Sequence, residues 1–169
     1  MSDALTTLGN DHLKKGITAA EAVIAANPND YVGYRVAADC YRIEENWPKF
    51  DEAMKKLTEL KPDSNGLLFA RAMEALERNH DRKKALDLLA EALQKDPKFT
   101  RARTQRLLAH DSVEDAWREY QELKQESPNH QVVVWLGPAL EREYESYEAE
   151  QRASERTQHS LQLLNKHDR

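Results

Sequence analysis

The amino-acid sequence predicts an all-α protein, a solenoid of helix pairs that ends in a C-terminal helix. Three observations carry this prediction. The 169-residue chain contains only 5 Gly and 6 Pro, and 33% of its residues are charged, a composition that favours helices over turn-rich sheets. Four of the prolines recur at intervals of 34, 35 and 31 residues, a period typical of helical repeats. A polar, helix-forming stretch follows the last of these prolines.

The charge balance and the single cysteine limit the possible partners. The net charge is -5 and the sequence pI is about 5.7, so the field of the chain repels a nucleic-acid backbone, and we expect no nucleic-acid partner. No stretch approaches the roughly 20 apolar residues of a membrane span, so we expect no membrane insertion. Cys40 stands alone, which excludes an intramolecular disulfide framework and fits a reducing, cytoplasmic location.

The repeated prolines predict where helices end. Proline lacks an amide proton and restricts the residue before it, so a helix stops just ahead of it. We therefore expect four units of paired helices, a partial fifth unit and a polar C-terminal segment. The predicted boundaries are 1–28, 31–62, 65–97, 98–128 and 131–138 for the units, and 139–169 for the C-terminal segment.

Small and apolar residues predict the buried face of each second helix. They lie twelve and eight residues before each repeated proline, four apart and therefore on one helical face. These residues are Gly16 and Ala20, Phe50 and Met54, Ala85 and Leu89, and Ala116 and Tyr120.

The leading helices combine aromatic residues with small residues at fixed offsets. In the two middle units these are Tyr34, Ala37, Ala38 and Tyr41, and then Phe69, Ala72, Met73 and Leu76. With the second-helix residues and the prolines, this pattern resembles the tetratricopeptide repeat family, strongly over 31–62 and 65–97. The resemblance implies a right-handed α-solenoid of antiparallel helix pairs with a concave groove that holds segments of partner proteins.

The flanking segments depart from this pattern. In the first unit Gly9 and Asn10 interrupt the leading helix, and the second helix is expected over 18–27. The fourth unit is about three residues short, so its leading helix, roughly 100–109, must be trimmed. A fifth leading helix starts near Val132 with Trp135 as its aromatic residue, and we expect Gly137 and Pro138 to break it.

The C-terminal segment is strongly helix-forming and polar. Positions taken from Leu140 in alternating steps of four and three are apolar at the ends of the series and polar in its middle, which disfavours a long coiled coil. A helix that caps the solenoid is the first interpretation, because terminal repeats need a polar outer face. A helix for a partner or a dimer, and a partly disordered tail, stay open.

No catalytic, metal-binding or cofactor-binding motif is recognisable. The six histidines form no metal-binding pair, and the five glycines are too scattered for a phosphate loop. We therefore expect a protein that is not an enzyme and that needs no metal and no cofactor. Cys40 forms a helical stripe with Val36 and Ile43, which predicts a small core residue rather than a nucleophile.

One basic run stands out in this acidic chain. It consists of Lys95, Lys98, Arg101, Arg103 and Arg106. Residues at this spacing spread around a solvated helix, which is the simpler interpretation, and a docking patch for a protein is the alternative.

The resemblance implies that a binding groove is lined by one stripe of each leading helix, the stripe on the side of the helix opposite its core face. The stripes consist of Arg35, Asp39 and Arg42, of Arg71, Glu74 and Arg78, and of Arg101, Gln105 and Leu108. Their i, i+3 or i+4, i+7 spacing makes the members project together. Ion pairs along one helix, Arg35 with Asp39 and Glu74 with Arg78, are the competing interpretation of the same residues.

These observations favour a non-catalytic scaffold or adaptor that binds a peptide or helical segment of a partner protein in the groove. Two alternatives remain. One is a small acidic secretion chaperone of the tetratricopeptide type, which the length and the net charge fit. The other is a structural protein that forms homo-oligomers through the groove or through the C-terminal helix.

Overall fold

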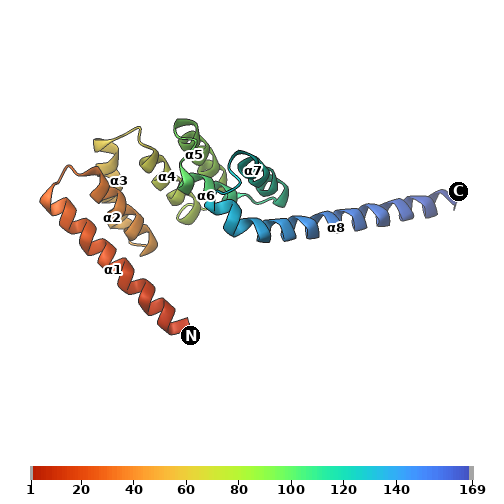
Figure 1. The fold of residues 1–169 in the computed structure, drawn as a ribbon, viewed down its shortest axis with the longest axis horizontal. Helices are drawn as coiled ribbons and strands as arrows, with labels where there is room; N and C mark the ends of the chain where they lie inside the picture. Colours follow the sequence, from red (N-terminus) through yellow and green to blue (C-terminus); the bar gives the residue numbers. More distant parts are fainter. Residues whose placement is uncertain (1, 168–169) are drawn as a thin grey trace. The chain divides into compact units, whose positions relative to one another are not determined.

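A computed structural model describes residues 2–167, with side chains from 9 to 159, and shows an all-helical chain (Figure 1). It consists, over the described residues, of eight helices: α1 (Ser2–Ala26), α2 (Tyr31–Ile43), α3 (Trp47–Leu60), α4 (Asn65–Glu77), α5 (Arg82–Lys95), α6 (Thr100–Ala109), α7 (Val113–Glu126) and α8 (Gln131–His167). The chain forms two compact units, Met1–Arg103 and Thr104–Arg169, whose boundary falls inside α6. None of the helices in the described part combines the length and apolar character needed to cross a bilayer.

The repeated prolines end helices as the sequence predicts. The helices α1, α3, α5 and α7 each end two residues before one of them, at Ala26, Leu60, Lys95 and Glu126. The short α6 spans Thr100–Ala109, in agreement with the expected trimmed helix. The helix ends therefore recur at the same intervals as the prolines.

Polar side chains begin the helices that follow the turns. Each accepts a hydrogen bond from a backbone amide of the first helical turn, a group that would otherwise lack a partner. The acceptors are Asp30, Asn46, Ser64, Asp81 and Ser112. Such a cap contributes about 1 kcal/mol to the stability of a helix.

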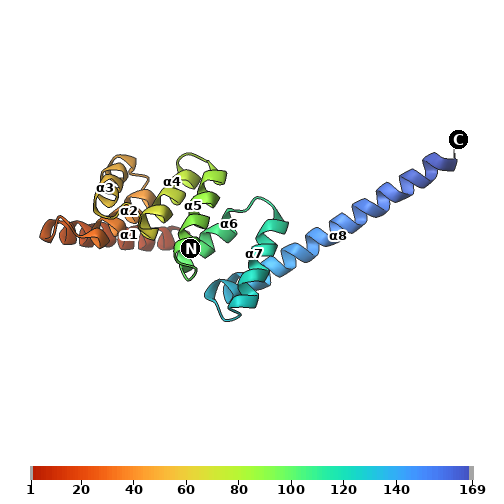
Figure 2. The ribbon, with the colours of Figure 1, turned by 90° about the horizontal axis from the view of Figure 1, so that it is seen from above.

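The core of the first unit lies where α2 packs against α1 and α3, and where α4 packs against α5 (Figure 2). The predicted face of the second helices is buried there: Ala20, Phe50, Met54, Ala85 and Leu89. Among the aromatic residues of the leading helices, Tyr41 and Phe69 are also buried. Complete burial of a side chain such as Phe50 or Leu89 contributes about 2 kcal/mol.

The predicted interruption of the first unit at Gly9 and Asn10 is wrong. The helix α1 continues through both residues, so the segment before Pro28 contributes one long helix instead of a pair. A glycine within a helix costs only about 1 kcal/mol relative to alanine, and both residues are exposed, where no packing opposes a helical backbone.

The predicted break at Gly137 and Pro138 is also wrong, because α8 runs through both residues. Pro138 cannot donate to the carbonyl of Val134, but Pro138 and Val134 are exposed, so water can satisfy that carbonyl. Gly137 is buried against α7, and a Cβ at this position would lie 2.5 Å from Oη of Tyr120. The glycine permits close packing of α8 on α7.

The second unit is held by the contact between α7 and the first half of α8. The ring of Trp117 stacks on that of Tyr144 with centroids 4.4 Å apart, and Glu141 accepts hydrogen bonds from Tyr120 and Lys124. Tyr147 donates to Glu114 one turn further on. Beyond this point α8 continues past α7, and its side chains from 149 to 159 are exposed (Figures 1 and 2).

Trp135 is not the core aromatic residue that the sequence predicts. It is 73% exposed, because α8 turns Val132, Val133 and Leu136 toward the core of the second unit and leaves Trp135 on the opposite face. Since α8 continues as one helix, the chain supplies no second helix of a fifth pair at this point.

Candidate functional site

The predicted stripe of α2 meets the first turn of α6 in a three-residue cluster. Arg101 donates to Oδ2 of Asp39 at 2.9 Å, and Arg35 lies 3.7 Å from the same oxygen. The side chains of Arg35, Asp39 and Arg101 are 33%, 19% and 44% exposed. Two guanidinium groups share one carboxylate, so the cluster keeps a net positive charge in contact with solvent.

Arg101 also covers an aromatic ring of α4. Its guanidinium carbon lies 4.4 Å from the centroid of Phe69, within the range of a cation–π contact. Phe69 itself is buried and contacts the ring of Phe99 at 5.7 Å between centroids. Arg101 therefore extends from the start of α6 over α4 to α2, and it contacts one residue of each of these two helices.

The last residue of the α2 stripe, Arg42, pairs with a residue that the sequence interpretation missed. Its Nη1 lies 2.5 and 2.6 Å from the two carboxylate oxygens of Glu77 on α4. Glu77 lies next to Arg78 in the sequence but on a different face of α4, so helical spacing alone assigned it to another stripe. This ion pair joins the C-terminal ends of α2 and α4.

A cavity of about 400 Å³ opens beside this pair. Its lining residues are Arg42, Ile43, Glu45, Trp47, Glu77 and Arg78. Ile43 is 59% exposed, so its predicted place in a core stripe with Cys40 is wrong. It is the last residue of α2, where the chain turns away, and its side chain forms part of the apolar wall of the cavity.

The predicted stripe of α4 faces mainly toward α3. Arg78 donates to Asp51 at 2.7 Å and lies over the ring of Trp47 at 5.3 Å. Arg71 lies 3.4 Å from the hydroxyl of Thr58. The structure thus separates these residues from the cluster at Asp39, although Arg78 shares the cavity with Arg42.

Both predicted pairs along one helix are present. Arg35 lies 3.7 Å from Asp39, and Arg78 lies 3.3 Å from Glu74. Asp39 and Arg78 each also reach another helix, which the spacing within one helix could not indicate. Gln105 is half-buried and lies in the part of α6 that belongs to the second unit.

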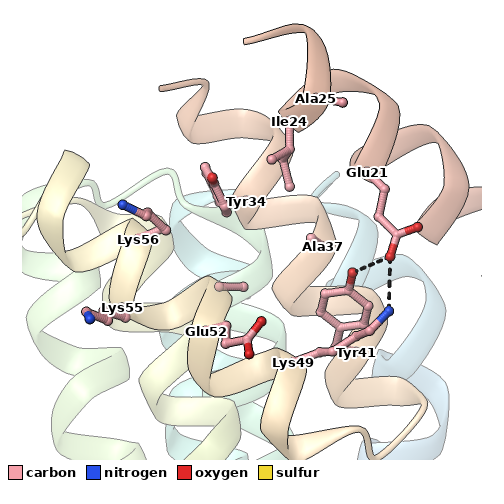
Figure 3. A pocket seen from close by; sticks show the side chains of 11 residues that line it. Glu21, Ile24, Ala25, Tyr34, Ala37, Tyr41, Lys49, Glu52, Lys55 and Lys56 are labelled. Carbon is pink, nitrogen blue, oxygen red and sulfur yellow. Dashed lines mark hydrogen bonds and ion pairs between the residues drawn. The ribbon is translucent and has the colours of Figure 1, made fainter. Parts of the chain in front are cut away.

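A second, larger cavity of about 570 Å³ lies between α1, α2 and α3 (Figure 3). Ile24, Tyr34, Ala37 and Ala53 form its apolar wall, and charged side chains surround its mouth. Sequence reasoning missed this cavity, because its wall consists of residues that helical spacing assigns to a core.

One end of the larger cavity is closed by a hydrogen-bonded group. The hydroxyl of Tyr41 donates to Oε1 of Glu21 at 2.8 Å, and Lys49 donates to the same oxygen at 3.1 Å (Figure 3). These two bonds lower the pKa of Glu21. Burial and the bond to Glu21 raise the pKa of Tyr41 to about 12. Glu21 is therefore held as a carboxylate, and Tyr41 as a neutral phenol.

The thiol of Cys40 lies against α1, close to Gly16. Burial raises its pKa, and the carboxylates of Asp39 and Glu44 raise it further. A thiol with a raised pKa is a poor nucleophile, which supports the predicted packing role.

The basic run is divided among separate contacts. Arg101 binds Asp39, Arg103 donates to the carbonyl of Pro97 at 2.6 Å, and Arg106 lies 3.3 Å from Glu119. The members point to different neighbours, as expected for residues spread around a helix.

The chain shares its fold with solved tetratricopeptide-repeat structures, while no family model and no curated protein matches its sequence. A thermophilic tetratricopeptide-repeat protein of Thermus thermophilus, TTC0263, is 18% identical with a TM-score of 0.61, over 85% of this chain and 76% of that chain. One structure of MamA is 19% identical with a TM-score of 0.52, over 92% of this chain and 97% of that chain. At these identities the likeness shows the fold.

Proposed function

We propose that this protein is a non-catalytic scaffold or adaptor that binds a peptide or helical segment of a partner protein. The binding groove follows the stripe of α2 and the neighbouring faces of α4 and of the first turn of α6. The contact of Arg101 with Asp39 across Phe69 carries this proposal, because one side chain at the start of α6 contacts both α4 and α2. This groove presents side chains from several helices to one extended ligand.

The charges of the groove favour a segment with carboxylates. Arg35 and Arg101 together outweigh Asp39, and the ion pair of Arg42 with Glu77 is neutral. The Asp39 carboxylate is neutralised by its two neighbours, Arg35 and Arg101, so it does not repel a carboxylate of the ligand. The remaining positive charge is exposed to solvent. Its attraction for a carboxylate of the ligand therefore weakens with added salt, which shortens the Debye length to about 3 Å at 1 M.

The cavity at Arg42 supplies an apolar contact at one end of this groove. Ile43 and Trp47 form apolar walls, while Arg78 lies against the ring of Trp47. A large side chain of the partner segment fits between them, because aromatic and arginine side chains in a cleft are typical anchors of protein interfaces. The groove thus combines a charged centre with an apolar end.

The test neutralises all three members of the Arg35, Asp39 and Arg101 cluster at once, so that no charged group loses its partner and stays behind. The triple variant Arg35→Gln, Asp39→Asn, Arg101→Gln neutralises all three groups, and the control variant Glu91→Gln, Lys95→Gln neutralises an exposed pair on α5. Proteins that co-purify with the full chain are quantified by mass spectrometry at near-physiological and at high salt.

We expect the wild type and the α5 control to retain the same set of proteins at near-physiological salt. The triple variant and the high-salt sample lose this set. Equal retention by the triple variant, with its fold confirmed by circular dichroism, contradicts a groove at this position.

A further inference from the structure

The cavity at Arg42 lies where two leading helices end. Ile43, the last residue of α2, and Glu77, the last residue of α4, both line this space of about 400 Å³. The backbone dipoles of a helix give its C-terminal end a partial negative charge, which attracts cations. Two such ends at one cavity therefore favour a cationic group over an anionic one.

The two guanidinium groups that line the cavity are already paired. Nη1 of Arg42 lies 2.5 and 2.6 Å from the two carboxylate oxygens of Glu77. Arg78 donates to Asp51 at 2.7 Å and lies 3.3 Å from Glu74. Three carboxylates thus hold two guanidinium groups, so the five residues together carry a net negative charge and leave no free cation for an anionic ligand.

A further carboxylate at the cavity has no partner. Glu45 is exposed, and its side chain makes no ion pair or hydrogen bond within the part of the chain that the structure describes. Its φ is 56°, and the amides of Glu45 and Asn46 donate to the carbonyls of Arg42 and Tyr41. Glycine is the usual residue at such a helix end, so a glutamate side chain is held here at the cavity by a fixed backbone.

The apolar walls suit the stem of a long basic side chain. Ile43 is 59% exposed, and Trp47 is half-buried beside it in the lining. Lysine and arginine pack their methylene groups on apolar surface while the charged head reaches a polar group. A purely apolar side chain would use the walls alone, whereas a basic side chain also pairs with Glu45.

We propose that this cavity binds an arginine or lysine side chain of the partner segment, with the methylene groups on Ile43 and the charged head at Glu45. The inference rests on the proposed function and identifies the group at the end of the groove. Ile43 follows Asp39 by four residues on α2, about 6 Å along the helix axis. An extended segment covers this distance in about two residues. The partner segment therefore carries a basic residue about two positions from the acidic residue that contacts Arg35 and Arg101.

The probe is a phage-displayed library of random peptides, selected in parallel on four forms of the full chain. These are the wild type, Glu45→Gln, Glu44→Gln and the groove variant Arg35→Gln, Asp39→Asn, Arg101→Gln. Glu44 is an exposed carboxylate outside the cavity lining, so Glu44→Gln removes the same charge one residue away from the site. Circular dichroism and thermal melting confirm that all four forms are folded.

We expect the wild type and Glu44→Gln to select peptides that combine an acidic residue with an arginine or lysine about two positions away. Glu45→Gln keeps the acidic residue and loses the preference for the basic one. In one selected peptide, norleucine in place of the basic residue weakens binding to the wild type about two- to fivefold in fluorescence anisotropy, the range of an exposed ion pair. The same replacement leaves binding to Glu45→Gln unchanged, which the double-mutant cycle isolates.

Three results overturn the proposal, and one of them also removes the groove. Wild-type peptides with an acidic but no basic residue leave the groove in place and exclude a cation in the cavity. A preference for a basic residue that survives in Glu45→Gln, or that is equally lost in Glu44→Gln, shows that Glu45 does not select it. A selection that enriches no sequence on the wild type, or the same sequences on the wild type and on the groove variant, contradicts the proposed function and this inference with it.

Discussion

The guanidinium of Arg101 lies 4.4 Å from the centroid of the Phe69 ring. The same side chain donates to Asp39, which is 62 residues away in the sequence. One residue at the start of α6 thus contacts two earlier leading helices. Because Phe69 is buried, the guanidinium covers the edge of the core and holds the charged surface above it.

Replacing Arg101 therefore destabilises the first unit. Arg101→Ala removes a cation–π contact and a partly exposed ion pair, and we expect a loss of about 1 kcal/mol in the free energy of unfolding. Arg101→Lys keeps the charge but loses the planar stacking, so its loss is smaller. Urea unfolding followed by circular dichroism measures both. A stability equal to that of the wild type in both variants contradicts a structural role for the contact.

Gly137 is required for the close packing of α8 on α7. Gly137→Ala places a methyl group against the ring and hydroxyl of Tyr120, and we expect a loss of about 1–3 kcal/mol from overpacking. Gly9→Ala is the matched control, since a Cβ at Gly9 meets no atom within 4 Å. In a helix this control substitution is neutral or stabilising by up to about 1 kcal/mol. A lower melting temperature in Gly137→Ala, with an equal or higher one in Gly9→Ala, confirms the packing role of Gly137. Equal changes in the two variants refute it.

Because of Tyr41, the free energy of unfolding depends on pH in the alkaline range. Its pKa is raised by burial and by the bond to Glu21 to about 12 in the folded state, against about 10 in an unfolded chain. The neutral phenol therefore stabilises the fold fully below about pH 10, and this contribution is lost as pH rises toward about pH 12.

The variant Tyr41→Phe isolates this contribution. Near neutral pH it loses one hydrogen bond, about 1 kcal/mol, and is less stable than the wild type. With rising pH the difference in urea midpoint shrinks and then reverses, because phenylalanine does not ionise. A difference that stays constant from about pH 9 to about pH 11.5 shows that Tyr41 titrates like an exposed tyrosine.

The thiol of Cys40 reacts slowly in the folded protein. Its half-buried position and raised pKa keep the fraction of thiolate low at neutral pH. We expect iodoacetamide to modify Cys40 at least about tenfold more slowly in the native protein than in urea, where the thiol has its ordinary pKa. A native rate equal to the rate in urea places Cys40 outside the core.

Helix ends and buried faces could be predicted from the sequence because they depend on local chemistry. A proline ends a helix wherever it stands at the end of an apolar period, and the four repeated prolines did so. Phe50 and Leu89 are buried because four-residue spacing puts them on one face of a helix with their apolar neighbours.

Features that depend on how one helix lies against another could not be predicted. The sequence predicts that Gly137, which precedes a proline, breaks the helix. Its packing role is visible only from the proximity of Tyr120 in the structure. Arg78 belongs to the stripe opposite the core, yet the placement of α3 turns it toward Asp51. Glu77, which pairs with Arg42, lies on the neighbouring face. Helical spacing predicts which residues share one face of a helix, but it does not predict which other helix that face contacts.

Crosslinking from the groove tests the central claim most directly. A photoreactive amino acid in place of Ile43, an exposed residue at the cavity of the groove, is compared in the native cell with one in place of Gln94 on the exposed side of α5. We predict specific adducts with a partner protein from position 43 only, and their loss when Arg35, Asp39 and Arg101 are neutralised. Adducts that are the same from both positions, or that persist after neutralisation, contradict binding in this groove.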